Sequence, residues 1–320
     1  MCGIAGIFDF RSKSNLNKEL LQKMSNVIAH RGPDSEGQFL SKSANFGMSF
    51  RRLSIVDLSE NGSQPMSGEN NHFTISFNGE IYNHKEIRNN LEKDHIKFKS
   101  NTDTESILYG FAKHGEQILD KMVGMWGISI WDEEKQELFL SRDRIGIKPV
   151  YYYYEDGLFI YASEIKSILE HPDVKREVNL SEIPNYLTLG MSSRHQTLFL
   201  GIKKLPSGHN LIINSDGAIK IQRYWHPFTK SENKSSPEDL QKETIKQLRS
   251  SISSRMMSDV PFGVFLSGGV DSSLNVALMA ELMGSPVETF TVGFKELEKF
   301  NELKYARQIS EKFKTNHHEI

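Results

Sequence analysis

Cys2 is the sole cysteine in the 320-residue sequence, and the initiator methionine directly precedes it. Because this methionine is usually removed before a small residue, we expect the mature chain to begin with a thiol and a free α-amine on one residue. An α-amine titrates near ~8 and can act, directly or through a water molecule, as the base that activates its own thiol. A lone cysteine can also be a small buried hydrophobe, so the nucleophile hypothesis depends on the other motifs.

A second chemical motif, Ser267-Gly268-Gly269-Val270-Asp271-Ser272-Ser273, separates an apolar strand pattern at 262–266 from a helical pattern at 274–283. Adjacent glycines let a ligand approach the backbone closely. Serines at the helix start can cap it, and the first helical N–H groups face an anion. The motif therefore predicts a phosphate or pyrophosphate cradle, with Asp271 holding Mg²⁺ or shaping the loop. Because G-x-x-x-x-G-K-[ST] is missing, it is not a Walker P-loop.

The elements that must position these motifs divide the chain into three parts. Residues 1–205 contain many short strand patterns with helical stretches between them, which predicts sheets layered with helices. Residues 206–237 carry turn signals and polar residues, and we expect them to connect two domains. In residues 238–320 the patterns alternate as α-β-α-β-α, which predicts the start of a parallel α/β domain.

Further motifs follow one another in a distinctive order along the chain. They are His30-Arg31-Gly32-Pro33-Asp34, Arg52-Leu53-Ser54-Ile55-Val56-Asp57, Asn78-Gly79-Glu80-Ile81-Tyr82-Asn83, Thr102-Asp103-Thr104-Glu105, Arg142-Asp143-Arg144-Ile145-Gly146-Ile147-Lys148-Pro149 and Asp259-Val260-Pro261-Phe262-Gly263-Val264. With these motifs the chain resembles the glutamine-hydrolysing asparagine synthetase family. The resemblance implies a class II glutamine amidotransferase domain, an α+β N-terminal-nucleophile hydrolase with an αββα sandwich, over 1–205. It implies the start of an α/β parallel-sheet ATP-pyrophosphatase domain over 238–320.

The resemblance also implies roles in the first domain. Cys2 would attack the glutamine carboxamide, and Asn78 with the Gly79 amide would form the oxyanion hole. Arg52 would bind the α-carboxylate through its planar guanidinium, and Asp103 would receive the α-ammonium. The remaining glutamine-binding residues would be Leu53, Ile55, Val56 and Glu80.

In the second domain the resemblance implies that ATP binds with Mg²⁺ at Asp271. The ATP-binding residues would be Phe265, Ser267, Gly268, Gly269, Val270, Asp271, Ser272 and Val292, with Phe265 and Val292 lining the adenine pocket. The family reaction adenylates aspartate with release of pyrophosphate, and ammonia from the first site then displaces AMP to give asparagine. The implied partners are glutamine, ATP and aspartate, with a homodimer as the implied assembly.

Several of these residues also have simpler interpretations. Asn78-Gly79 is the strongest short hairpin signal, and we expect a turn that also carries function. A lone Arg52 or Asp103 is usually a solvated charge. The loop 30–33 fits turn geometry as well as it fits catalysis, so it receives no role. His317 and His318 are adjacent on an expected strand and would point to opposite faces, which argues against a metal site.

Composition excludes several classes of protein. The net charge is −2, so no overall field attracts nucleic acid or membrane surfaces. No stretch approaches the ~20 apolar residues of a membrane span, and the N-terminus does not resemble a signal peptide. One cysteine cannot form an internal disulfide, which indicates a reducing compartment. We therefore expect a cytoplasmic protein without nucleic-acid or membrane partners.

The family extends well beyond the last residue of this sequence, so the resemblance implies a C-terminally truncated synthetase half. The motifs of its aspartate pocket have no match here, and three alternatives stay open. The chain could aminate another carboxylate, such as one on a glycan or a peptide. It could be a glutaminase-only fragment, or a non-catalytic protein. Neither the acceptor nor a partner chain that supplies the missing part can be read from these residues.

Overall fold

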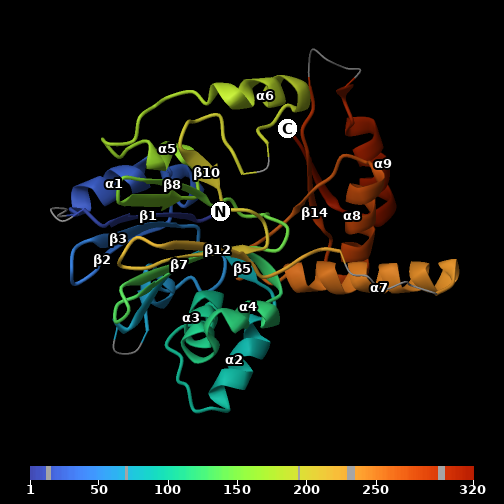
Figure 1. Ribbon diagram of the computed structural model, residues 1–320. Helices are drawn as coiled ribbons and strands as arrows, with labels where there is room; N and C mark the ends of the chain where they lie inside the picture. Colours follow the sequence, from blue (N-terminus) through green and yellow to red (C-terminus); the bar gives the residue numbers. More distant parts are fainter. Residues whose placement is uncertain (12–15, 69–70, 194, 229–234, 295–299) are drawn as a thin grey trace. The chain divides into compact units, whose positions relative to one another are not determined.

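The computed structural model describes residues 1–320 except 12–15, 69–70, 194, 229–234 and 295–299 (Figure 1). The chain divides into two compact units, unit 1 at Met1–Lys230 and unit 2 at Ser231–Ile320. Unit 1 contains two sheets and unit 2 contains one among the described residues, and each unit has its own buried core.

The first sheet of unit 1 is antiparallel, with the strand order β10-β8-β9-β1-β3-β2 among the described residues. Its strands are β1 (Gly3–Asp9), β2 (Ser35–Leu40), β3 (Phe46–Arg52), β8 (Tyr151–Glu155), β9 (Leu158–Ala162) and β10 (Ile202–Lys204). Every residue of β1 is buried. Since successive side chains of a strand point to opposite faces, a strand covered on both faces must be apolar throughout, as Gly3–Phe8 is.

The second sheet of unit 1 is also antiparallel, with the order β12-β11-β7-β6-β5-β4 in the described part of the chain. Its strands are β4 (Met66–Ser67), β5 (Phe73–Ile81), β6 (Gly124–Asp132), β7 (Glu137–Arg142), β11 (His209–Ile213) and β12 (Ile219–Arg223). Trp131, Leu138 and Leu140 of this sheet share a buried cluster with Ile4 and Phe8 of the first sheet. The two sheets therefore pack face to face.

Helices cover the outer face of each sheet (Figure 1). The helices of unit 1 are α1 (Lys18–Asn26), α2 (His84–Glu92), α3 (Asp103–His114), α4 (Ile118–Lys121), α5 (Ile165–Ile168) and α6 (Ile183–Leu189). Leu21 and Met24 of α1 and Ile168 of α5 pack against Ala5 and Ile7 of β1. Residues of α2, α3 and α4 form a second cluster with β5 and β6. These layers confirm the predicted αββα sandwich.

The connection between the two units is shorter than the sequence indicated. Residues 206–237 were expected to be a connecting segment, but β11 and β12 extend the second sheet within this range. The turn signals at 206–208 and 215–217 flank β11 and do not mark a linker. Leu211 and Ile213 of β11 are fully buried, so the hairpin belongs to the core of unit 1, which ends at Lys230.

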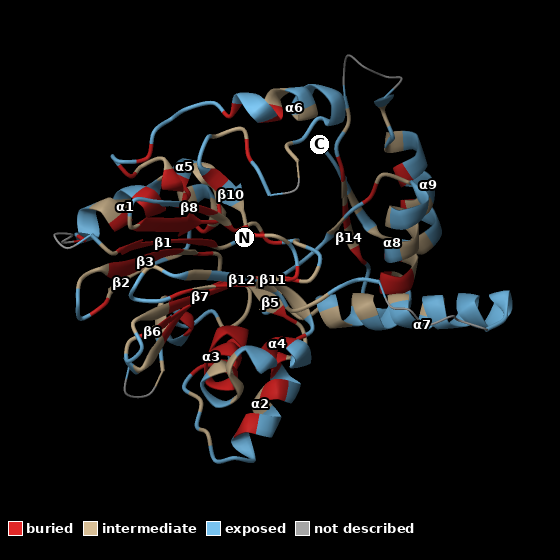
Figure 2. Ribbon diagram, viewed as in Figure 1, coloured by how far each residue is buried: buried red, intermediate tan, exposed pale blue. Residues whose placement is uncertain are grey.

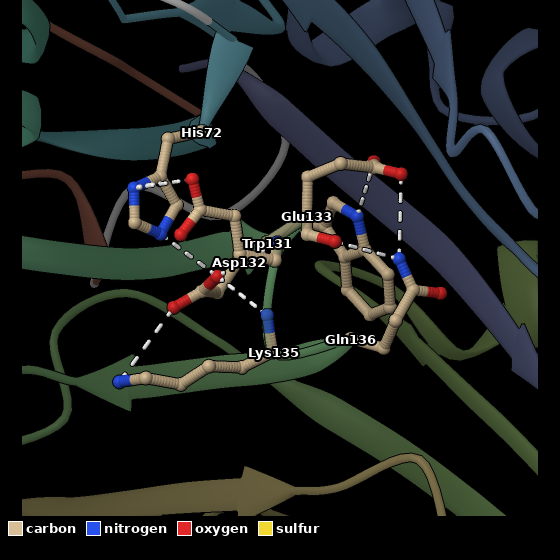
Figure 3. Close-up of polar contacts among 7 residues, drawn as sticks. His72, Trp131, Asp132, Glu133, Lys135 and Gln136 are labelled. Atoms are coloured by element: carbon tan, nitrogen blue, oxygen red, sulfur yellow. Dashed lines mark hydrogen bonds and ion pairs between the residues drawn. The ribbon is translucent and has the colours of Figure 1, made fainter.

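The turn between β6 and β7 is held by Asp132 (Figure 3). Asp132 Oδ1 accepts hydrogen bonds from the backbone N–H groups of Glu134 and Lys135, each at 3.0 Å. The same oxygen lies 3.0 Å from His72 Nε2, next to the start of β5. Asp132 thus fixes the hairpin and ties it to the residue that precedes β5, the strand that pairs with β6.

Unit 2 is a small parallel α/β domain, as predicted. Its elements in the described residues are α7 (Pro237–Arg255), β13 (Val264–Phe265), α8 (Val270–Leu282), β14 (Glu288–Thr291), α9 (Leu303–Phe313) and β15 (Asn316–Glu319). The strand order is β13-β14-β15, all parallel. Leu266, Val276 and Ala306 form its buried cluster. No residue of α7 is buried (Figure 2), so this helix adds little to the core.

Candidate active site

Strand pairing in the first sheet brings Cys2 beside Arg52. β1 begins one residue after Cys2, and β3 ends at Arg52; since these strands are antiparallel, Gly3 lies opposite Arg51. The Leu53 N–H donates a hydrogen bond to Cys2 Sγ at 3.4 Å, and the thiol lies 3.7 Å from the Leu53 carbonyl oxygen. The backbone N–H and carbonyl groups of Leu53, the residue after β3, therefore both contact the sulfur.

The second sheet supplies Asn78 and Gly79, but not as a turn. Both lie within β5 and pair with Gly127 and Trp126 of β6, so the hairpin prediction for this dipeptide was wrong. Glycine is required at 79 because a Cβ atom there would lie 2.2 Å from the Met125 carbonyl oxygen. Close strand packing, not a turn conformation, explains the residue.

The Asn78 side chain is buried but makes no hydrogen bond within the described protein. Its exposed fraction is 1%, and neither its oxygen nor its nitrogen has a partner. Buried amides are nearly always paired, because leaving one unpaired costs about 1–3 kcal/mol. A buried amide without a hydrogen bond, beside a candidate nucleophile, is suited to form hydrogen bonds with a bound ligand.

Two buried charges complete the candidate site. Arg52 is 6% exposed, and its guanidinium donates to the carbonyl oxygens of Ser59, at 2.8 Å, and of Asp57. Asp103 is 7% exposed at the start of α3, and its Oδ2 accepts the Ile81 N–H at 2.9 Å. Arg52 and Asp103 are therefore not solvated surface charges, which is the usual interpretation of such residues when each is considered alone.

Burial shifts the acid–base behaviour of the site. Burial raises the pKa of Asp103 to about 7, with the negative charge of Glu80 adding to the shift and the Ile81 N–H opposing it. Burial also raises the pKa of the Cys2 thiol, against the opposing effect of the Leu53 N–H. It lowers the pKa of the N-terminal amine, here that of Met1. A thiol with a raised pKa needs a base to form the reactive thiolate.

One cavity of about 70 Å³ joins Cys2 with every residue that the sequence assigned to glutamine binding. The shared lining is Cys2, Arg52, Leu53, Ile55, Val56, Asn78, Gly79, Glu80 and Asp103. The other lining residues were not predicted from the sequence, namely Met1, Gly62, Gln64, Phe77, Thr102, Thr104, Met125 and Lys148. Main-chain and side-chain groups of both sheets therefore face the same space.

Lys148 is the most unexpected of these lining residues. It is only 5% exposed, and its Nζ donates a hydrogen bond to Met1 Sδ at 3.1 Å. Its backbone N–H donates to the buried Asp143 at 2.8 Å, which holds this part of the loop after β7. Burial lowers the pKa of the Lys148 ammonium. A lysine by itself predicts an exposed side chain. The one sequence feature that could have placed Lys148 at the site is its position in the motif 142–149.

Arg31, in the loop that received no role, contacts the nucleophile directly. Its Nε donates to the Cys2 carbonyl oxygen at 2.9 Å, and its Nη1 donates to Glu164 at 2.9 Å. Glu164 also lies 3.0 Å from His30 Nε2. This group of side chains fixes the backbone of Cys2 relative to the end of β9.

The glycine-rich loop of unit 2 lies between β13 and α8, as expected. Gly268 has φ +79°, and a Cβ there would lie 2.4 Å from the Tyr305 Cβ. Both the backbone conformation and the close contact therefore require glycine. The N-cap of α8 is Gly269, without a side-chain cap, which corrects the expected serine cap. Ser272 instead lies 3.3 Å from the Ser267 backbone N–H, from which it accepts a hydrogen bond, and its hydroxyl is 3.0 Å from that of Ser267.

The other predicted ATP-binding residues are exposed at the same edge of the parallel sheet. Phe265 is 77% exposed at the end of β13, Val292 directly follows β14, and Val270 starts α8. Asp271 is exposed in the first turn of α8. The carboxyl ends of parallel strands are where such folds bind ligands, so the placement suits a nucleotide.

Metal binding at Asp271 is compatible with this geometry. In the residues that the structure describes, no group of three or more His, Cys, Asp or Glu side chains is arranged to hold a metal ion. Mg²⁺ at nucleotide sites takes one or two carboxylates together with phosphate oxygens and water. A single exposed carboxylate beside the loop therefore fits a Mg²⁺ that arrives with its nucleotide.

The fold is a two-sheet αββα sandwich with Cys2 in its cavity, and comparison with known families identifies the class. Residues 1–225 match the family described as glutamine amidotransferase domain, and the chain belongs to this family. Residues 243–320 match the asparagine synthase family. Within the described residues, no helix combines the length and apolar character needed to cross a membrane.

Several curated relatives are similar along almost the whole chain. Asparagine synthetase (glutamine-hydrolysing) 1 of Bacillus subtilis is 36% identical over 97% of this chain and 48% of its own length. Asparagine synthetase 3 of the same organism is 33% identical over 99% of this chain and 54% of its own. Asparagine synthetase B of Escherichia coli is 32% identical over 100% and 54%. The chain thus spans about half the length of these relatives.

Solved structures support the fold. The glutamine phosphoribosylpyrophosphate amidotransferase of B. subtilis, in complex with ADP and GMP, superposes with a TM-score of 0.52 at 14% identity. The match covers 99% of this chain and 65% of that chain. At this identity the likeness concerns the fold alone.

Proposed function

We propose that unit 1 hydrolyses glutamine to glutamate and ammonia at the Cys2 cavity. The Cys2 sulfur adds to the carbon of the side-chain carboxamide and forms a tetrahedral oxyanion. The intermediate collapses by breaking the C–N bond, which leaves a thioester on Cys2 and releases ammonia once the nitrogen has gained a proton. Water then hydrolyses the thioester to glutamate and restores the thiol. The N-terminal amine is the base that removes and returns the proton.

The observation that carries this proposal is the unpaired, buried amide of Asn78 in the cavity of Cys2. An oxyanion hole needs donors that are already in place and need not leave other partners when charge develops. The Asn78 Nδ2 meets this condition, with the Gly79 N–H as the second donor. The long Arg52 side chain, held by the carbonyl oxygens of Asp57 and Ser59, would bind the α-carboxylate. Asp103 and Glu80 would bind the α-ammonium.

The test is glutaminase activity of the whole chain. We expect equal amounts of glutamate and ammonia from glutamine, and we expect both to disappear in Cys2→Ala. Mass spectrometry of the N-terminus should find Cys2 as the first residue of the active protein. Hydrolysis that persists without Cys2, or a fully active protein that retains Met1, would contradict the proposal.

For unit 2 we propose ATP binding at the loop 267–273. The loop amides and the start of α8 would hold the phosphates, Asp271 would hold Mg²⁺, and Phe265 and Val292 would contact the adenine. Bound Mg²⁺ would neutralise phosphate charge during adenylation of a carboxylate. The support is the match to the asparagine synthase family and the glycine geometry of the loop.

Aspartate is the proposed acceptor because the similar proteins are named asparagine synthetases. The proposed overall reaction is glutamine-dependent asparagine synthesis, an ATP-dependent ligase activity that yields AMP and pyrophosphate. Pyrophosphate release from Mg-ATP, aspartate and ammonium tests it. Release that depends on aspartate would support asparagine synthesis by this chain. Without it, the chain would be a glutaminase only or would use another carboxylate acceptor. The homodimer and the cytoplasmic location stay predictions, which sedimentation and cell fractionation can test.

A further inference from the structure

The segment 53–62 closes over the guanidinium of Arg52 and is held by a residue outside the cavity lining. The Asp57 carbonyl oxygen accepts a hydrogen bond from Arg52 Nη2, and the Ser59 carbonyl oxygen accepts one from Nη1 at 2.8 Å. Gly62 completes the contact, because a Cβ there would lie 2.1 Å from Arg52 Nη2. The direction of the guanidinium is therefore set by the backbone path of this segment.

The Asp57 carboxylate sets that path from both ends. Its Oδ1 accepts the Ser59 N–H at 3.0 Å and the Ser59 hydroxyl at 2.6 Å, which closes the turn over Arg52. Its Oδ2 accepts the backbone N–H of Asn101 at 2.7 Å. Asn101 lies two residues before Asp103, so one carboxylate joins the segment that holds Arg52 to the segment that leads into Asp103.

The Asp103 side of this connection is equally well fixed. Thr102 caps α3 by accepting the Glu105 N–H at 3.2 Å, and Asp103 is the first residue of the helix. Glu105 in turn accepts the backbone N–H groups of Lys99 and Ser100, at 2.8 and 2.7 Å. The segment 99–103 is thus a single hydrogen-bonded piece, and the Asp57 carboxylate ties it to the turn over Arg52.

The backbone of Asp57 indicates that the residue type matters. Its φ is +54°, in the left-handed region that non-glycine residues other than Asn and Asp seldom occupy. Hydrogen bonds from Ser59 and Asn101, with the charge of Arg52, lower the pKa of Asp57 even though burial alone would raise it. The ionised carboxylate, which accepts on both oxygens, is the form that fits these contacts.

We propose that Asp57 is a positioning residue that fixes the spacing between Arg52 and Asp103, and so determines recognition of the α-amino acid head group. This inference rests on the proposed glutaminase function and deepens it. Asp57 does not line the cavity and acts only through the two charged residues that do. Loss of its carboxylate should weaken head-group binding while leaving the chemistry at Cys2 intact.

The test is Asp57→Asn in the full chain. Asparagine tolerates the same backbone conformation, but its amide can accept on only one side, so either the Ser59 or the Asn101 connection is lost. We expect glutamate binding, measured by calorimetry, to weaken ~10- to 100-fold, the effect of losing one charge-assisted hydrogen bond. KM for glutamine should rise similarly while kcat changes less than about threefold. Asp94→Asn is the matched control, because the exposed Asp94 pairs with Lys113 away from the cavity.

Alkylation of Cys2 by iodoacetamide separates positioning from general damage. Iodoacetamide has no α-amino acid head group, so its rate of reaction should be equal in Asp57→Asn and the parent, while protection by glutamate should require higher glutamate concentrations in the variant. Unchanged glutamate affinity, or an alkylation rate that falls with it, would overturn the inference. If Asp57→Asn does not fold, Ser59→Ala removes one of the same contacts and should weaken glutamate binding a few-fold.

The two proposals can fail separately. A parent chain that binds glutamate but releases no ammonia from glutamine would refute the glutaminase function, and the Asp57 comparison would still decide the inference. A parent chain that neither binds glutamate nor hydrolyses glutamine would refute both.

Discussion

The two units differ in how far they bury the residues predicted to bind ligands. In unit 1, Arg52, Asn78 and Asp103 are all buried, and layers of sheet and helix lie around them. In unit 2, Phe265 and Val270 are largely exposed, and the buried cluster comprises Leu266, Val276 and Ala306. Bond cleavage by a thiol needs donors and charges that the fold already holds in place. A phosphate loop depends mainly on its own backbone amides, which a short parallel sheet is enough to position.

The largest expected effect is that of Cys2→Ala, which should be confined to unit 1. Cys2→Ala should lower kcat for glutamine hydrolysis at least ~10³-fold, because no other residue supplies the nucleophile. ATP binding by unit 2 should be unchanged, as judged by calorimetric titration with Mg-ATP. A variant that loses both activities would show that the site in unit 2 depends on the one in unit 1.

Asn78→Ala sharpens the claim that unit 1 maintains an unpaired buried group for chemistry. The turnover number should fall ~10²–10³-fold, the usual cost of one oxyanion-hole donor. Thermal stability should stay the same or rise, since the lost amide has no hydrogen-bond partner in the folded protein.

Asn210→Ala is the control for this experiment. Asn210 is equally buried in β11 and its Oδ1 is also unpaired, but its Nδ2 donates to Glu116 at 3.3 Å. This variant should lose stability and keep its activity. The same outcome for both asparagines would mean that the Asn78 amide has no special role.

Gly268→Ala tests whether unit 2 depends on its loop backbone. The new Cβ would be forced against Tyr305 at a φ of +79°, so we expect Mg-ATP affinity to fall at least ~10-fold while glutamine hydrolysis is retained. Gly284→Ala is the matched control, because a Cβ there meets nothing within 4 Å. Equal ATP affinities for the two variants would argue against a phosphate cradle at this loop.

The smallest expected effect concerns pH and the buried carboxyl of unit 1. Burial raises the pKa of Asp103 to about 7, whereas an unfolded aspartate titrates near ~4. Between about pH 4 and about pH 7 the carboxyl of Asp103 is protonated in the folded chain but largely ionised in the unfolded chain. The free energy of unfolding should therefore decrease as pH rises from about 4 to about 7. The α-ammonium of glutamate favours the ionised form, so glutamate affinity should rise a few-fold between about pH 6 and pH 8. Asp103→Asn should abolish both trends in denaturant unfolding and calorimetry, and persistence of either trend would assign it to another group.

The residues of the candidate site could be predicted because their types and order are distinctive, but their convergence depends on strand register. Arg52 reaches Cys2 only because β3 runs antiparallel to β1. The dipeptide Asn78-Gly79 was misassigned to a turn because pairing with β6 overrides a local preference. Likewise, β12 resembled a linker because it is a short edge strand with polar residues such as Lys220 and Gln222. The buried Lys148 was missed because its position depends on tertiary packing alone.

One hydrogen bond inside the sandwich offers an optical measure of the assembled site. The Tyr161 hydroxyl of β9 lies 2.5 Å from the Ser129 hydroxyl of β6, in the interior between the sheets. β9 is the neighbour of β1, which directly follows Cys2, and β6 is the neighbour of β5, which carries Asn78. Burial strongly raises the pKa of the Tyr161 phenol, so this tyrosine should ionise only when the sheets separate. The part of the ultraviolet difference signal that Tyr161→Phe removes from an alkaline titration would then mark the pH at which the strands beside Cys2 and Asn78 separate.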